Sequence, residues 1–179
     1  MKTLLTCLLL AGCSLLASAQ NKEQGLFVEL NGGYGQSERY NHTHDGYAFL
    51  APGIGYQFNN RWAAGVKTRF ELAADKFKAF GAYGQYTFWQ RNRLKFFGEA
   101  ATTLSVCSGM DGGDDTYWEA GLSAGADYSL GSHCSLLLRY LHIGYSDARH
   151  RNEDFCLGEG RFIVDGNLKR LQIGVQWIF

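Results

Sequence analysis

The sequence predicts an all-β protein: an eight-stranded antiparallel up-and-down transmembrane β-barrel that follows a cleaved signal peptide. Three observations favour this fold class. The final segment, Leu171–Phe179, places a large apolar side chain at every second position, as a β-strand with one apolar face does. The same period recurs along the chain. Charged residues make up 19% of the sequence, below the roughly 25% of an average soluble domain.

The first 19 residues have the organisation of a secretory signal peptide. Lys2 supplies the positive start, Leu4–Leu16 is broadly apolar, and Ala17–Ala19 forms a small-x-small cleavage site. We therefore expect residues 1–19 to be removed and residues 20–179 to form a single barrel domain. One alternative stays open: Leu10–Cys13 resembles a lipobox, and cleavage there leaves Cys13 as a lipidated N-terminus.

The first four predicted strands put apolar side chains at alternate positions. Trp62–Ala73 is the clearest, because Val66 and Phe70 alternate with Lys67 and Arg69. The other three repeat this pattern, with apolar residues on one face and small or polar residues on the other. In chain order, the four strands are Leu26–Gln36, Tyr47–Phe58, Trp62–Ala73 and Ala79–Phe88.

The last four predicted strands carry the same signal with one irregular member. In His133–Tyr145, Leu137 and Leu141 share a face with Arg139, so apolar residues occur on both faces. The other three strands separate apolar from polar residues more cleanly. In chain order, these strands are Leu94–Val106, Tyr117–Leu130, His133–Tyr145 and Leu168–Phe179.

The connections between the predicted strands differ in length at the two ends of the barrel. Short periplasmic turns and long outer loops are typical of bacterial membrane barrels. We therefore expect both chain termini on the periplasmic side. The short turns are Asn59–Arg61, Gln90–Arg93 and Gly131–Ser132, and the opposite end carries Ser37–Gly46, Cys107–Thr116 and Ser146–Arg161, with Ala74–Lys78 as a short exception.

A soluble eight-stranded lipocalin-like barrel alternates in the same way, and the period does not say which face is inside. Two features favour the membrane form. The polar faces of Ala79–Phe88 and Tyr117–Leu130 carry many glycine, serine, glutamine, threonine and tyrosine residues, whereas a solvated exterior carries more lysine and glutamate. A soluble barrel also has no need of an aromatic last strand.

The four tryptophans fall at the ends of predicted strands. In a membrane barrel, indole rings gather at the two interfaces between lipid and water. We therefore predict aromatic belts that contain Trp62, Trp89 and Trp177 at the periplasmic end and Trp118 at the outer end.

Charged side chains of both signs fall on the face that a membrane barrel turns inward. Eight strands enclose a lumen about wide enough for side chains to fill, and buried charges there must pair. The sequence therefore predicts a plug of salt bridges, with a narrow gated or proton-selective pore as the alternative. The predicted network comprises Glu29, Lys67, Arg69, Glu71, Glu99, Glu119 and Arg139, with Asp127 nearby.

Three cysteines follow the signal peptide. Cys107 and Cys156 both fall at the outer end of the predicted barrel, and Cys134 falls at the periplasmic end. An exported protein permits disulfides, so Cys107 and Cys156 are candidates for one. The spacing alone does not establish this pairing.

The predicted outer loops suggest partners rather than cofactors. Ser146–Arg161 is the longest and carries charges of both signs, which suits contact with a host surface, lipopolysaccharide or a partner protein, or solubility alone. The spaced His42 and His44 are interpreted as part of a solvated loop, so no metal or other cofactor is expected. The 17 basic and 17 acidic residues balance, which gives no reason to expect nucleic acid.

Taken together, the strand number, the loop asymmetry, the charged lumen and the aromatic last strand resemble the small eight-stranded outer-membrane barrels of the outer-membrane protein X and outer-membrane protein A transmembrane-domain type. The resemblance covers almost all of residues 26–179. It implies a monomer among lipid and lipopolysaccharide in the outer membrane of a Gram-negative bacterium. It also implies that the barrel assembly machinery reads the last strand, here through Val175, Trp177 and Phe179.

An enzymatic alternative comes from Leu141–Ala148, which resembles the strand of the lipid A deacylase barrels, where a lipid-facing His and Ser form a catalytic pair. His142 and Ser146 share a face, and Glu153 or Glu159 is available to orient the imidazole. In that family the His lies two positions before the Ser, whereas here it lies four positions before it, about 13 Å along a strand at ~3.4 Å per residue.

This mismatch favours a barrel without enzymatic activity. We therefore expect a non-enzymatic protein that acts in envelope structure or in surface interaction through its outer loops, with a lipid A-modifying hydrolase and a narrow gated pore as alternatives.

Overall fold

The computed structural model describes residues 24–38, 44–72, 77–108, 114–147, 162–165 and 171–179. Among these residues, no helix is long and apolar enough to cross a membrane. The strands of the described chain are β1 (Gly25–Glu38), β2 (His44–Gln57), β3 (Trp62–Glu71), β4 (Phe77–Arg91), β5 (Leu94–Ser108), β6 (Asp114–Ser129), β7 (Cys134–Ser146), β8 (Phe162–Asp165) and β9 (Gln172–Ile178).

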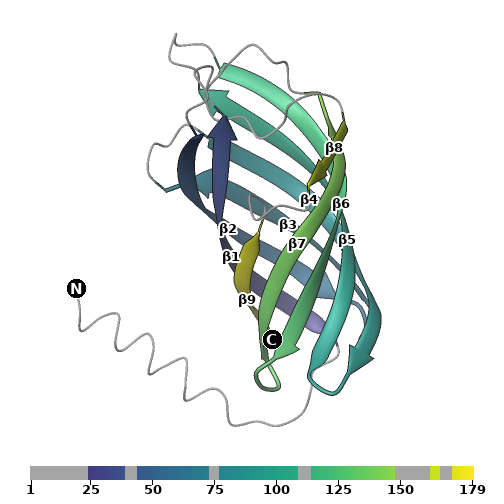
Figure 1. Cartoon of the computed structure of the whole chain (residues 1–179). Coiled ribbons are helices and arrows are strands. Elements are labelled where there is room, and N and C mark those ends of the chain that lie inside the picture. The colour runs from purple at the N-terminus through teal and green to yellow at the C-terminus, as the bar shows by residue number, and fades with distance from the viewer. Residues whose placement is uncertain (1–23, 39–43, 73–76, 109–113, 148–161, 166–170) are drawn as a thin grey trace, which may run out of the picture.

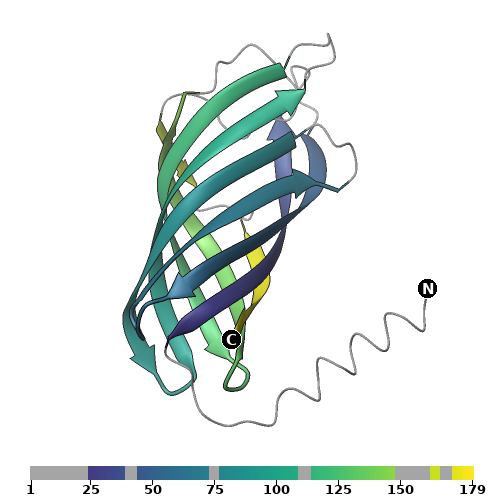
Figure 2. The ribbon, with the colours of Figure 1, turned by 180° about the vertical axis from the view of Figure 1, so that it is seen from behind.

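Eight of the nine strands close into an antiparallel barrel (Figure 1). Consecutive strands pair from β1 to β7, β7 then pairs with β9, and β9 pairs with β1. The closing ladder runs from Phe27 opposite Ile178 to Gly33 opposite Gln172. Figure 2 shows the wall that lies at the back in Figure 1, and its strands are strongly tilted from the barrel axis, as closure of a sheet requires. The predicted eight-stranded antiparallel barrel is confirmed, whereas the predicted signal peptide, residues 1–19, lies outside the described residues and stays a prediction.

The predicted strand limits are approximate, and the eighth predicted strand starts later than expected. It begins at Gln172, and the expected start, Leu168, lies outside the described residues. The additional strand β8 pairs with the outer half of β7, whereas β9 pairs with its periplasmic half. The two pairings differ in register, because Arg139 lies opposite Gln172 while His142 lies opposite Asp165. Alternation of side chains does not reveal such a shift.

The short turns lie at the same end of the barrel as the C-terminus (Figure 1). In the β2–β3 turn, the Asn59 Oδ1 atom accepts hydrogen bonds from the backbone N–H groups of Arg61 (2.8 Å) and Trp62 (2.9 Å). In the β4–β5 turn, Asn92 adopts a left-handed backbone with φ of 53°, a conformation that asparagine tolerates better than most residues. These local preferences explain why the turns were predictable from sequence.

The barrel has an apolar exterior and a polar interior. Leu122, Phe80 and Leu104 each expose more than half of their surface. Such exposure is unfavourable in water, by roughly 25 cal/mol per Å² of apolar surface, and favourable against lipid. Inside the barrel, Glu99 and Arg139 are only 3% exposed. A lipocalin-like barrel has the opposite arrangement, so the structure decides between the two interpretations in favour of the membrane form.

A β-bulge explains the irregular pattern of β7. Leu141 lies opposite Ala124 and Arg139 lies opposite Gly125, so Tyr140 is the extra residue that the bulge inserts into this ladder. Tyr140 and Leu141 therefore both face outward, at 38% and 49% exposed. The bulge reverses the alternation, so His142 and Ser146 turn toward the lumen while Ile143 and Tyr145 face outward.

Aromatic rings inside the barrel lie against glycines of neighbouring strands. A Cβ atom at Gly55 would lie 2.3 Å from the Phe27 ring, and one at Gly125 would lie 2.5 Å from the Phe97 ring. A Cβ atom at Gly125 would also meet the backbone oxygen of Leu138 at 2.4 Å. These glycines are needed because the rings and backbone occupy the space of a side chain.

We expect Gly125→Ala to lower the free energy of unfolding by about 1–3 kcal/mol, the usual cost of overpacking a core. Gly84→Ala is the matched control, because a Cβ atom at Gly84 meets nothing within 4 Å. Urea titration of tryptophan fluorescence in lipid vesicles measures both changes. Equal stability of the two variants would contradict the close-packing interpretation.

Candidate functional site in the barrel lumen

The Arg139 side chain is the centre of a polar cluster that crosses the lumen. Its Nε atom donates to Glu99 Oε2 at 2.8 Å, and its two terminal nitrogens donate to Glu29 Oε2 at 2.9 Å and to Asn31 Oδ1 at 2.6 Å. Arg139 comes from β7, Glu99 from β5, and Glu29 and Asn31 from β1. One guanidinium therefore connects three strands from opposite parts of the wall.

Lys67 extends this cluster to a fourth strand, β3. Its ammonium group forms an ion pair with the second carboxylate oxygen of Glu99. The ammonium also lies 4.6 Å from the centre of the Tyr83 ring, within the range of a cation–π contact. We call Glu29, Lys67, Glu99 and Arg139 the ion cluster, since each bonds to at least one other member.

The ion cluster contains two positive and two negative side chains, so its formal charge is zero. Balance matters because removing a charge from water costs several kcal/mol, and only close pairing with further hydrogen bonds compensates for it. Asn31 supplies one such bond to Arg139, and its own amide nitrogen donates to the Ala51 carbonyl oxygen at 3.3 Å. The cluster is thereby linked to the backbone of β2.

The other predicted members of the network lie outside the ion cluster. The Arg69 guanidinium stacks 4.8 Å from the centre of the Phe49 ring. Glu71 is buried, and its Oε2 atom has no hydrogen-bond partner. Glu119 lies 3.6 Å from the Nε2 atom of His142. The sequence placed all seven charges inside the lumen but did not distinguish which of them meet.

His142 joins two residues of β6 on the luminal side. Its Nδ1 atom lies 3.1 Å from the Ser123 hydroxyl oxygen, and its Nε2 atom faces Glu119. The lipid-facing His142–Ser146 pair considered from the sequence is therefore wrong in its orientation. The bulge at Tyr140 turns His142 inward, and Ser146 is completely buried. The postulated orienting residues Glu153 and Glu159 lie outside the described residues.

Three of the predicted belt tryptophans contact, in tilted arrangements, aromatic neighbours that the sequence analysis did not assign to the belts. The Trp62 ring lies 4.6 Å from Tyr86, and the Trp89 ring lies 5.2 Å from Phe96. At the opposite end, Trp118 lies 6.3 Å from Tyr145. These are cross-strand neighbours, and their pairing follows from register, which single-strand periodicity does not provide.

The C-terminal strand presents its predicted signal residues to the outside. Val175 and Phe179 are 46% and 53% exposed. Trp177 stacks on His133 with ring centres 5.8 Å apart. The backbone N–H of Phe179 donates to the Leu26 carbonyl oxygen at 2.8 Å, so pairing with the first strand continues to the last residue.

The cysteines and the metal-binding potential of the chain are only partly described. Cys107 lies within β5, opposite Asp115 of β6, rather than at the start of a loop. Cys156 lies outside the described residues, so the Cys107–Cys156 pairing stays a prediction. Cys134 is a free thiol. In the described part of the chain, no group of three or more His, Cys, Asp or Glu residues is arranged to hold a metal ion.

Comparison with known proteins agrees with this geometry. The family described as "Outer membrane protein beta-barrel domain" matches residues 5–179. A search of curated proteins finds no match.

Two solved structures are similar in fold. The N-terminal β-barrel domain of Pseudomonas aeruginosa OprF has a TM-score of 0.61 at 12% identity, covering 88% of this chain and 100% of the other. Neisserial surface protein A (NspA) has a TM-score of 0.60 at 16% identity, covering 88% and 99% of the two chains. At these identities the likeness concerns the fold alone.

We expect Arg139→Met to lower the free energy of unfolding by about 3–5 kcal/mol, because it leaves two buried carboxylates with only Lys67 to compensate them. Adding Glu29→Gln should restore part of the loss. Arg69→Met removes the same charge from the lumen outside the ion cluster and should cost much less. Denaturant titration in lipid vesicles measures all three. A similar loss for both arginine variants would argue against the cluster as the stabilising unit.

Proposed function

The chain belongs to the outer membrane protein β-barrel domain family, and on this basis we propose that it is a non-enzymatic barrel that supports the envelope or interacts with other surfaces through its outer loops. The observation that carries this proposal is the ion cluster. Arg139 and Glu99 bring four strands into contact across the lumen. An ion cluster that links four strands suits a rigid barrel. Such a barrel acts through the loops at its ends rather than through a pore along its lumen.

The connections between strands differ in length at the two ends of the barrel, and this difference supports a role at the cell surface. In this family short turns face the periplasm and longer loops face the exterior. The described short turns lie within Phe58–Arg61, Asn92–Arg93 and Leu130–His133. The opposite end carries the longer connections, with charges of both signs between Ser146 and Arg161. Rigid strands that present variable polar loops are a common arrangement for binding surfaces.

The apolar outer surface of the barrel supports the proposal that lipid and lipopolysaccharide surround the protein. Apolar side chains such as Leu122 and Ile143 cover the wall, and the aromatic pairs Trp62–Tyr86 and Trp118–Tyr145 lie at its two ends. Aromatic girdles of this kind anchor a barrel at both interfaces. The exposed Val175 and Phe179 suit recognition of the last strand by the barrel assembly machinery. We further propose that the barrel functions as a monomer.

Planar-bilayer recordings test whether the lumen is closed. We expect the intact protein to show no steady ion current, because the ion cluster occupies the lumen. The double variant Glu29→Ala/Arg139→Ala removes one opposite-charge pair and should produce a measurable leak, whereas Arg69→Ala should not. Steady conductance by the intact protein would favour the gated-pore alternative.

Mass spectrometry of lipid A tests the enzymatic alternative. We expect overexpression of the intact protein to leave the acyl chains of lipid A unchanged, because His142 contacts Ser123 and Glu119 inside the barrel rather than facing lipid. Deacylated lipid A that disappears in both His142→Ala and Ser146→Ala would overturn the non-enzymatic proposal. Activity lost with Ser123→Ala instead would assign the nucleophile to the luminal serine.

A further inference from the structure

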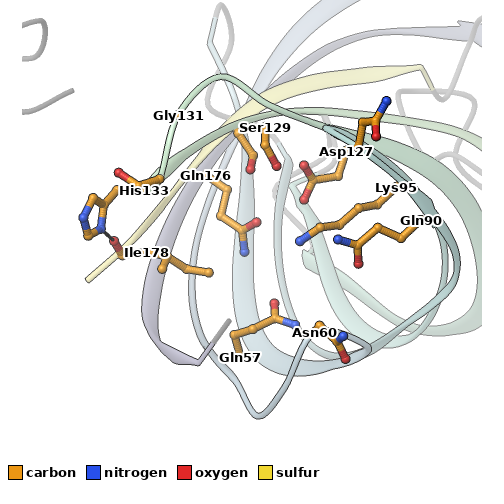
Figure 3. Close-up of a pocket in the computed structure, with 13 residues that line it drawn as sticks. Gln57, Asn60, Gln90, Lys95, Asp127, Ser129, Gly131, His133, Gln176 and Ile178 are labelled. Carbon is orange, nitrogen blue, oxygen red and sulfur yellow. Dashed lines mark hydrogen bonds between the residues drawn. The ribbon is translucent and has the colours of Figure 1, made fainter. Parts of the chain in front are cut away.

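A second polar site lies at the periplasmic mouth of the lumen, separate from the ion cluster (Figure 3). Residues from all three short turns line it, among them Asn60, Asn92 and Gly131. Asp127 of β6 and Lys95 of β5 lie deeper in the same pocket. We propose that this mouth binds a zwitterionic α-amino-acid group, with the ligand ammonium on Asp127 and the ligand carboxylate on Lys95.

Asp127 has an unsatisfied oxygen in this pocket. The residue is only 5% exposed, and its Oδ1 atom has no hydrogen-bond partner among the described residues. Ser135 of β7 also lines the pocket, beside the same carboxylate. A buried carboxylate oxygen without a donor is unfavourable. A ligand N–H group that reaches it would remove this cost, which gives the site a reason to bind an ammonium.

Lys95 supplies the opposite charge beside Asp127. The two residues lie directly opposite each other in the β5–β6 ladder. Among the ion pairs between described residues, none joins Lys95 to Asp127. Figure 3 shows both side chains directed into the pocket. A cation and an anion held side by side in this way match the two ends of a zwitterion.

The rest of the wall favours hydrogen bonding over apolar contact. Gln57, Gln90 and Gln176 come from three different strands and turn their carboxamides toward the pocket (Figure 3). Carboxamides both donate and accept. The Gln57 Nε2 atom already donates to the carbonyl oxygens of Asn59 and Trp62, so Gln90 and Gln176 are the carboxamides that donate to the ligand. Ile178 is the one large aliphatic side chain among the lining residues. This composition does not suit an aliphatic ligand or stacking of a sugar ring.

Charge and size restrict the ligand further. One carboxylate and one ammonium balance, so a simple anion or a simple cation would satisfy only half of the site. The cavity measures about 40 Å³, room for about three water molecules at the ~10–15 Å³ that each requires. That space suits the ammonium, α-carbon and carboxylate of an amino acid whose side chain points out toward the periplasm.

Calorimetric titration of the full-length folded protein in detergent micelles tests the proposal with three probes. Glycine carries both charges, glycinamide only the ammonium, and N-acetylglycine only the carboxylate. We expect glycine to bind and each analogue to bind at least about tenfold more weakly, because each loses one charge-assisted hydrogen bond. Absence of glycine binding at millimolar concentration, or equal binding of glycinamide, would overturn the proposal.

Two variants assign the binding to these residues. Asp127→Asn and Lys95→Met should each weaken glycine binding at least about tenfold. Ser105→Ala, a buried luminal change at the outer end of β5, should leave it unchanged. Heat-modified gel mobility verifies that each variant is folded. Unchanged affinity in folded Asp127→Asn and Lys95→Met would place the bound glycine elsewhere and refute the site. If a variant does not fold, the three-probe comparison on the natural protein still decides.

A fourth probe distinguishes a free amino acid from an α-amino-acid group that is attached to a larger molecule. Nε-acetyl-lysine carries the α-amino-acid group at the end of a longer chain. Binding similar to that of glycine would support the site and indicate a group attached to a larger envelope molecule. Much weaker binding than glycine would support the site for free small amino acids only.

Discussion

The constraint on which this structure depends is that, in hydrocarbon, every backbone N–H and C=O group must bond within the protein. The ladder between β1 and β9 meets this constraint where the two ends of the barrel domain come together. Phe27 lies opposite Ile178, and the Phe179 N–H still reaches the Leu26 carbonyl oxygen. Without this ladder two strand edges would face lipid. The sheet would then be open, and its polar inner face would no longer be separated from the lipid that surrounds its apolar outer face.

Closure creates a second problem, because inward-facing side chains share a narrow space. The protein meets it in two ways. Rings such as Phe97 pack against glycines such as Gly125 on neighbouring strands, which leaves little room unfilled. The charges near the centre are balanced, with Arg139 bound to both Glu29 and Glu99. At the periplasmic mouth the balance is looser, since Asp127 and Lys95, both among the described residues, lie opposite each other without forming an ion pair. That difference separates a structural cluster from a candidate binding site.

The predictions from sequence were most accurate for properties that depend only on the residues nearby in the chain, such as the face of a strand on which a side chain lies. Alternation placed Lys67, Glu99 and Arg139 on the inward face because a regular strand turns every second side chain to one side. The same rule misplaced His142. A bulge at Tyr140 shifts the alternation by one residue, and the mixed apolar pattern of His133–Tyr145 was its only trace in the sequence. The roles of Asn31 and Ser123 were missed because short polar residues are common in any lumen.

The sequence by itself determined the all-β class, the approximate strand limits, the short turns and the membership of the two faces, because all of these follow from local periodicity and turn chemistry. Only the tertiary structure decided which inward charges meet, that β8 and β9 divide one edge of β7, and that His142 contacts Glu119 and Ser123. The physical reason is register. Alternation specifies the face of a residue but not its height against a neighbouring strand, and cross-lumen contacts such as Arg139–Glu29 depend on the heights of strands far apart in the chain.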